Sequence, residues 1–301
     1  MNLVALWCYL TLAAFAAGCV FKTARYATAP VHLRWELYPL PSSGGAGFGG
    51  SYFEEVEWWL RPQRRLRLAE ARVIAAEVLT LATVRTHNRS LWMPSLAFHW
   101  GLYLLFALGA VLLGAGVVRA VGASVPAALG GGAPLSAWGA AGLGLGTLGA
   151  LALLARRTLQ PRLRGASTPA DFLHLGLLLS VFAASWGAWL VADREYASGS
   201  AFAAAIGSFR SAPVLTGWTA AQVVLLGLFL AYLPWSHMAH FFTKFFTWHS
   251  VRWDDLPTAG RQEAAVQRAL MLPAGWSAPH VRRGGGNTWN DIVRGGRGGS
   301  G

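Results

Sequence analysis

The residues of this sequence best suited to chemistry are histidines near the ends of apolar segments. His99 and His240 each lie close to one end of a long uncharged segment. A buried polar group costs free energy unless it has a partner, and an ionisable residue at membrane depth is a candidate functional residue. Two imidazoles from two helices at the same depth can act as axial ligands of a haem iron. The pattern therefore predicts that His99 and His240 bind iron.

Two further histidines are candidates for cofactor binding, with less specific roles. His174 lies early in the apolar stretch 172–192, and His237 precedes His240 by three residues, which places the two on roughly one side of a helix. Each could bond a backbone carbonyl, contribute to a quinone site, or bind a second haem. Imidazole titrates near neutral pH, as coupled electron and proton chemistry requires. We assign no ligand role to the histidines in loop or hydrophilic sequence, His32, His87, His249 and His280.

The elements that must position these histidines are long apolar helices. The chain has 301 residues, of which 54% are hydrophobic and only 13% are charged, compared with about 25% charged residues in a soluble domain. A spanning helix needs about 20 mostly apolar residues. The uncharged stretches that qualify are 1–21, 90–118, 120–155, 172–192 and 211–243. The sequence therefore predicts an all-α membrane protein with a bundle of five transmembrane helices.

Two of these stretches need comment. The third begins with a loop-like sequence rich in glycine and proline (122–136), so we expect its helix at about 137–154. The first lacks the basic n-region and the A-x-A cleavage site of a signal peptide, so we interpret it as a helix.

The basic residues predict the orientation of the bundle. Of the 25 Lys and Arg residues, all but Arg119, Arg194 and Arg210 fall in 22–92, in 156–169 or after residue 243. Basic loops stay in the cytoplasm, so we expect the N-terminus outside and the C-terminus inside, in a bacterial cytoplasmic membrane. The net charge of +12 then reflects topology and lipid contact, and we expect no nucleic-acid partner. On the cytoplasmic side, four arginines are candidates to pair with haem propionates: Arg85, Arg89, Arg162 and Arg164.

We expect four regions along the chain. They are a transmembrane helix (1–21), a cytoplasmic loop with an amphipathic helix at 63–84 (22–92), a haem-binding core of four membrane helices (93–248) and a cytoplasmic tail (249–301). The loop and tail are large enough to bind a soluble subunit. The only cysteines are Cys8 and Cys19, and no C-x-x-C-H motif occurs. Covalent haem is therefore excluded, and any iron–sulfur centre must belong to a partner.

Three segments together resemble the gamma subunit of respiratory nitrate reductase, a membrane cytochrome b with five helices. They are FHWGLYLLFALG (98–109), RRTLQPRLRGASTPADFL (156–173) and LPWSHMAH (233–240). The resemblance covers about half the chain and implies that His99 and His240 bind the haem on the cytoplasmic side. The positions of the second haem's ligands hold Gly109 and Gln222, which implies one haem b, or two if His174 and His237 rebuild a site.

A second resemblance implies the partners. The segments RWELYPLP (34–41), GGSYFEEVEWW (49–59) and KFFTWHSVRWDD (244–255) resemble membrane cytochromes paired with heterodisulfide-reductase-like iron–sulfur proteins in the transmembrane redox complexes of sulfate reducers. This resemblance implies an electron-transfer subunit that exchanges electrons between menaquinone and a cytoplasmic iron–sulfur subunit, in complexes that can include a multihaem cytochrome c. The alternative is a membrane anchor without redox chemistry, in which the histidines are satisfied packing residues.

Overall fold

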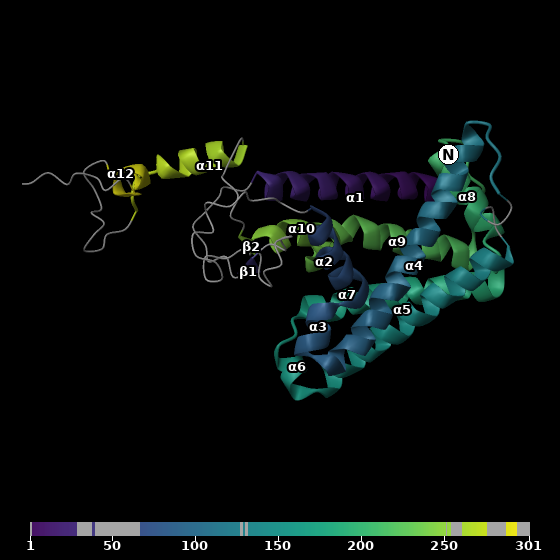
Figure 1. Ribbon diagram of the computed structural model, residues 1–301. Helices are drawn as coiled ribbons and strands as arrows, with labels where there is room; N and C mark the ends of the chain where they lie inside the picture. The colour runs from purple at the N-terminus through teal and green to yellow at the C-terminus, as the bar shows by residue number, and fades with distance from the viewer. Residues whose placement is uncertain are drawn as a thin grey trace, which may run out of the picture. The chain divides into compact units, whose positions relative to one another are not determined.

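The computed structural model describes residues 2–28, 38–39, 67–126, 129, 132–250, 252–253, 261–275 and 287–293. Within these residues the chain is almost entirely helical (Figure 1). The helices are α1 (Leu3–Ala27), α2 (Arg67–Thr80), α3 (Ala82–His87), α4 (Arg89–Ala120), α5 (Ala133–Leu159), α6 (Pro161–Gly165), α7 (Pro169–Gly187), α8 (Ala197–Gly207), α9 (Gly217–Tyr232), α10 (His240–Ser250), α11 (Arg261–Leu270) and α12 (Trp289–Val293). Short 3-10 and π turns and two-residue strands complete the described elements: η3 (Ala188–Ala192), η4 (Leu233–Trp235), η5 (His237–Ala239), β1 (Tyr38–Pro39) and β2 (Arg252–Trp253).

Among the described residues, five helical segments are long and apolar enough to cross a membrane. They are Leu3–Ala27, Arg89–Arg119, Ala133–Leu159, Pro169–Ala192 and Gly217–Trp235. Large apolar side chains on these segments remain exposed, for example Leu148 and Val191, as expected for surfaces that face lipid. The predicted five-helix membrane architecture is confirmed at this level, and the chain is a multi-pass membrane protein. The orientation of its termini stays a prediction.

The chain divides into two compact units. The first comprises Met1–Phe21 and Ile74–His240, and the second comprises Lys22–Val73 and Phe241–Gly301. The first unit contains nearly all of the membrane-spanning segments and most of the predicted haem-binding core. The second contains most of the predicted cytoplasmic loop and the tail.

The core of the first unit joins four helices. Buried side chains from α4, α5, α7 and the end of α9 pack into one cluster: Phe98, Leu143, Ala150, Leu175, Leu178, Val181, Phe182, Phe229 and Leu233. The first part of α1 packs on α9, where the Trp7 indole nitrogen donates to the Val224 carbonyl at 3.1 Å. This arrangement fixes the ends of α4, α7 and α9 relative to one another, and the candidate histidines lie near those ends.

The contact between α4 and α5 depends on glycines (Figure 1). A Cβ atom on Gly101 of α4 would meet the backbone of Gly146 in α5, and a Cβ atom on Gly149 would meet the backbone of Phe98. Small residues allow membrane helices to approach closely, and van der Waals packing then stabilises the pair. The glycines of α5 that face α4 are therefore part of its packing surface. The expected helix of about 137–154 is too short, because α5 runs from Ala133 to Leu159 and begins inside the sequence 122–136 that looked loop-like.

The fifth apolar stretch is not one helix, contrary to the prediction for 211–243. α9 ends at Tyr232, two 3-10 turns follow, and α10 begins at His240. Pro234 has no N–H to donate and its ring crowds the preceding turn, while Ser236 is extended and its hydroxyl accepts from the Met238 amide at 3.1 Å. The prediction that His237 and His240 share one helix side is therefore wrong.

The predicted amphipathic helix at 63–84 is also interrupted. Residues 63–66 lie outside the described part of the chain, and Leu81 has φ 49°, which ends α2 and separates it from α3. The last carbonyls of α2 lack partners within the helix and accept hydrogen bonds from α4 instead. The donors are Trp92 to Thr80 at 2.7 Å, Trp100 to Leu79 at 3.0 Å and Tyr103 to Val78 at 2.9 Å. The end of α2 is thus fixed to the helix that carries His99.

Two other boundaries differ from the prediction. α1 continues to Ala27, beyond the apolar stretch 1–21, because hydropathy marks the apolar part of a helix and not its polar last turn. α7 begins at Pro169, where Thr168 and Asp171 form a capping box.

The second unit contains short local contacts. β1 pairs in parallel with β2 through Tyr38 opposite Arg252 and Pro39 opposite Trp253. In the described part of the tail, the Trp289 amide at the start of α12 donates to the carbonyl of Leu272, just after α11, at 3.1 Å. Most of the loop sequences 34–41 and 49–59, with Trp35, Trp58 and Trp59, lie outside the described residues.

Candidate functional site

The structure brings His99 of α4 and His240 of α10 together, although 140 positions separate them in the sequence. Their ring centroids are 6.1 Å apart and their planes are inclined by 60°. His99 is half-buried and His240 is exposed. Both residues belong to the first unit. The structure thus places side by side the two imidazoles that the sequence predicted for an iron site; their binding of iron stays a prediction.

Hydrogen bonds fix the proton on each of these rings. Nδ1 of His99 lies 2.7 Å from the Ser95 carbonyl oxygen, and Nδ1 of His240 lies 3.3 Å from the His237 carbonyl oxygen. A carbonyl oxygen only accepts, so each Nδ1 carries a hydrogen. Histidines that bind a metal nearly always donate the other ring N–H in this way.

The separation of the rings fits a metal ion between them. A metal–imidazole bond of about 2.0–2.1 Å on each side would place the centroids of two opposite rings about 6.4 Å apart. The observed centroid distance of 6.1 Å is slightly shorter than this value, and a small rotation of either side chain would remove the difference. The ring separation alone is therefore close to that of two imidazoles on one metal ion.

The start of α4, which carries His99, is held by an arginine that the sequence analysis did not single out. Pro94 lies inside α4 and has no N–H to donate to the Ser90 carbonyl. The Arg156 guanidinium donates to this carbonyl at 2.6 Å and to the Ser90 hydroxyl at 3.0 Å. Arg156 thus supplies the missing hydrogen bond and ties α5 to the first turn of α4.

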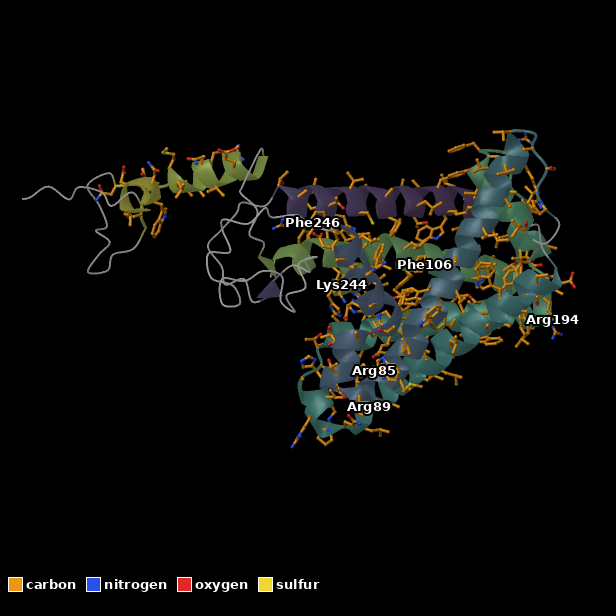
Figure 2. The ribbon with its side chains drawn as sticks, in the orientation of Figure 1. Arg85, Arg89, Phe106, Arg194, Lys244 and Phe246 are labelled. Atoms are coloured by element: carbon orange, nitrogen blue, oxygen red, sulfur yellow. The ribbon has the colours of Figure 1, made fainter. Side chains whose placement is uncertain are left out.

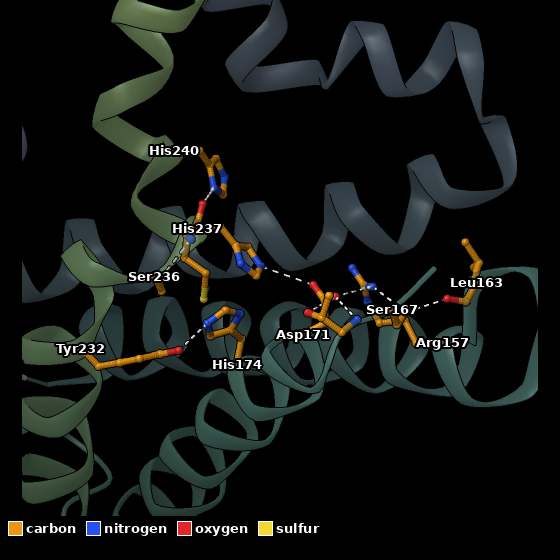
Figure 3. Close-up of polar contacts among 11 residues, drawn as sticks. Arg157, Leu163, Ser167, Asp171, His174, Tyr232, Ser236, His237 and His240 are labelled. Carbon is orange, nitrogen blue, oxygen red and sulfur yellow. Dashed lines mark hydrogen bonds and ion pairs between the residues drawn. The ribbon is translucent and has the colours of Figure 1, made fainter. Parts of the chain in front are cut away.

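His174 and His237 belong to a second cluster (Figure 3). His174 is buried, its Nε2 lies 2.7 Å from the Tyr232 hydroxyl, and its ring lies 4.3 Å from that of His237. Nε2 of His237 lies 3.3 Å from Oδ1 of Asp171. The 4.3 Å ring separation is much shorter than the roughly 6.4 Å needed for opposite ligands of one iron. The structure therefore gives no support for a second haem between His174 and His237.

The polar partners in this second cluster were not predicted. Asp171 lies three residues before His174, so the two share one side of α7. The sequence signal for Asp171 was the capping box Thr168-x-x-Asp171, which indicated a helix start and no chemistry. Tyr232 comes from α9, and only the packing of α7 against α9 could place it beside His174.

The four arginines predicted to pair with propionates lie in α3, at the start of α4 and in α6. Arg85 and Arg89 lie near the first turns of α4, whereas Arg194 lies at the opposite end of the first unit (Figure 2). The Arg85 guanidinium lies 5.2 Å from the centre of the Trp92 ring, and all four of Arg85, Arg89, Arg162 and Arg164 are exposed. Their pairing with a cofactor stays a prediction.

Comparison of the chain with family models, with curated proteins and with solved structures gave no match.

Proposed function

We propose that this chain is the haem-b subunit of a respiratory complex in a bacterial cytoplasmic membrane. In this function it relays electrons between menaquinone or menaquinol and a cytoplasmic iron–sulfur subunit of the heterodisulfide-reductase-like type. The observation that carries the proposal is the His99–His240 pair, with ring centroids 6.1 Å apart on a chain with five candidate membrane spans.

The chain's own residues have defined roles in this proposal. Nε2 of His99 and Nε2 of His240 would hold the iron, and the Ser95 and His237 carbonyls keep each ring in the required tautomer. A bound haem would supply a one-electron relay between a two-electron quinol and an iron–sulfur centre. Arg156 and the glycine contact between α4 and α5 hold the helix that presents His99.

The second unit supports the docking part of the proposal. It comprises Lys22–Val73 and Phe241–Gly301, and of its described residues only those at the end of α1 lie in a candidate span. A subunit that only crossed the membrane would not need an additional compact unit of this kind. We assign the binding of the iron–sulfur subunit to this unit.

The experiment is a pyridine haemochrome spectrum with haem-to-protein stoichiometry on the purified full-length chain and its variants. We expect one b haem per chain in the parent and loss of haem in both His99→Ala and His240→Ala. His87→Ala is the matched control, because His87 is exposed and its Nδ1 lies 2.9 Å from the Thr83 carbonyl of its own helix. This variant should keep its haem.

Other outcomes would contradict the proposal. Haem that persists in both His99→Ala and His240→Ala would show that other residues bind it. A parent protein without haem would leave the membrane anchor as the function.

A further inference from the structure

We propose that Asp171, His174 and His237 bind one divalent transition-metal ion of the Zn²⁺ class, at a site separate from the His99–His240 pair. Each residue offers one ligand atom, and the three atoms lie within 4.8 Å of one another. The three residues come from the first turns of α7 and from η5, so the site depends on the break after α9. This inference does not depend on the proposed haem function.

The spacing of two ligand atoms already matches a metal site. Zn²⁺ binds imidazole nitrogen and carboxylate oxygen at about 2.0–2.2 Å in a tetrahedron, which places neighbouring ligand atoms about 3.3–3.5 Å apart. Nε2 of His237 and Oδ1 of Asp171 are 3.3 Å apart. Because all three atoms lie within 4.8 Å, His174 needs to approach by about 1.5 Å at most to complete the triangle.

His174 gives the second, independent observation. Its side chain is 5% exposed, and Nδ1 is buried with no hydrogen-bond partner in the described part of the chain. Burying such a group without a partner costs free energy. Figure 3 shows Nε2 directed to Tyr232 and the other side of the ring directed to Asp171. An ion bound at Nδ1 would satisfy this nitrogen.

The atoms of Asp171 and His174 that do not face the site are held by other groups. Oδ2 of Asp171 accepts from the Thr168 amide at 2.8 Å and from the Thr168 hydroxyl at 3.0 Å, and lies 3.6 Å from the Arg157 guanidinium. Oδ1 is left to face His237. The Tyr232 hydroxyl in the same way fixes His174 Nε2. Metal ligands are typically oriented by such hydrogen bonds to their other atoms.

A simple ion pair accounts for less of this geometry. A protonated His237 beside Asp171 explains the 3.3 Å contact, but it leaves His174 Nδ1 buried without a partner. It also places a cationic ring 4.3 Å from the His174 ring. A metal ion accounts for all three ligand atoms at once. Two nitrogens and one carboxylate oxygen are a donor set that suits Zn²⁺, with water in the fourth position.

The ion would fix the turn that precedes α10. His237 is in η5 and His240 begins α10 three residues later, so a metal held by α7 and His237 would tie this turn to the bundle. We therefore expect the ion to stabilise the folded chain.

The test is isothermal titration with Zn²⁺ of the full-length protein, purified without a polyhistidine tag and treated with a chelator. We expect one Zn²⁺ per chain and a higher unfolding temperature when it binds, because a ligand of the folded state stabilises that state. Asp171→Asn and His237→Gln should weaken binding at least tenfold and abolish the increase in unfolding temperature. Tyr232→Phe keeps all three ligands and should weaken binding about 10- to 100-fold, the usual effect of losing an orienting partner.

Two variants serve as controls. His87→Gln removes an exposed histidine outside the cluster, and Gly144→Ala changes a position where a Cβ atom would meet nothing within 4 Å, so both should bind Zn²⁺ as the parent does. The proposal is overturned if the parent binds no Zn²⁺ or if Asp171→Asn and His237→Gln bind with unchanged affinity.

Discussion

Replacing Gly149 by alanine should separate α4 from α5 directly beside His99. Gly149 is buried in α5 and faces Phe98, the residue before His99. The matched control is Gly144→Ala in the same helix, since a Cβ atom on Gly144 would meet nothing within 4 Å. Both changes stabilise the helix itself by a similar amount, about 0.5–1 kcal/mol. The difference between the two variants therefore reports the helix contact alone.

The size of this difference follows from the packing. A Cβ atom on Gly149 would lie 2.7 Å from Cβ of Phe98, whereas ordinary van der Waals contact begins at 3.4 Å, and it would also meet the Phe98 backbone. The helices must therefore separate by at least the 0.7 Å between these two distances. A gap of about 0.5–1 Å removes a quarter to a half of the dispersion attraction between facing atoms. We expect Gly149→Ala to be about 1–3 kcal/mol less stable than Gly144→Ala, the usual cost of overpacking.

The assay is denaturant unfolding of both variants in detergent micelles, followed by tryptophan fluorescence. Haem content, measured in parallel, should fall in Gly149→Ala and stay at the parent level in Gly144→Ala, because only the former displaces the segment that carries His99. Equal free energies of unfolding for the two variants would refute the close contact between α4 and α5. A stable Gly149→Ala protein with full haem content would refute its connection to the site.

Two further predictions concern other parts of the first unit. Burial, together with the nearby Asp193 carboxylate, raises the pKa of Tyr196 from 10.0 to about 12. Folding therefore favours the neutral phenol, and this stabilisation should be complete below pH 10 and be lost between pH 10 and about 12. Comparing the free energies of unfolding of the parent and Tyr196→Phe across this pH range will check this. A tyrosinate absorbance that titrates near pH 10 in the folded protein would contradict this shift. Phe182 of α7 is 2% exposed and packs against Gly146, so Phe182→Ala should lower the free energy of unfolding by about 3–5 kcal/mol. Leu173→Ala, at a position 58% exposed on the same helix, should change it by about 0.5 kcal/mol or less. Similar losses in both variants would show that Phe182 is not a core residue.

Several features of the fold could be predicted from the sequence because they depend on local composition. A run of about 20 apolar residues forms a helix in lipid whatever its neighbours are, since its backbone groups must be satisfied within the helix. The five spans and their order follow from this rule.

The helix boundaries were less predictable. Hydropathy does not detect the polar last turn of α1, and the sequence 122–136, rich in glycine and proline, concealed the first turn of α5, which begins at Ala133. The break after Tyr232 required the combined effect of Pro234 and Ser236. A hydrophobic run by itself gives no sign of such an interruption.

The sequence by itself determined the membrane-spanning architecture and the position of the four candidate histidines near the ends of apolar stretches. Only the tertiary structure decided their partners. Because the chain turns between η5 and α10, His240 lies beside His99, whereas His237 lies beside His174 and Asp171. The physical reason is that depth depends on position along one helix, whereas the direction of a side chain depends on backbone turns and on packing between helices. Residues three apart in the sequence therefore belong to two different sites.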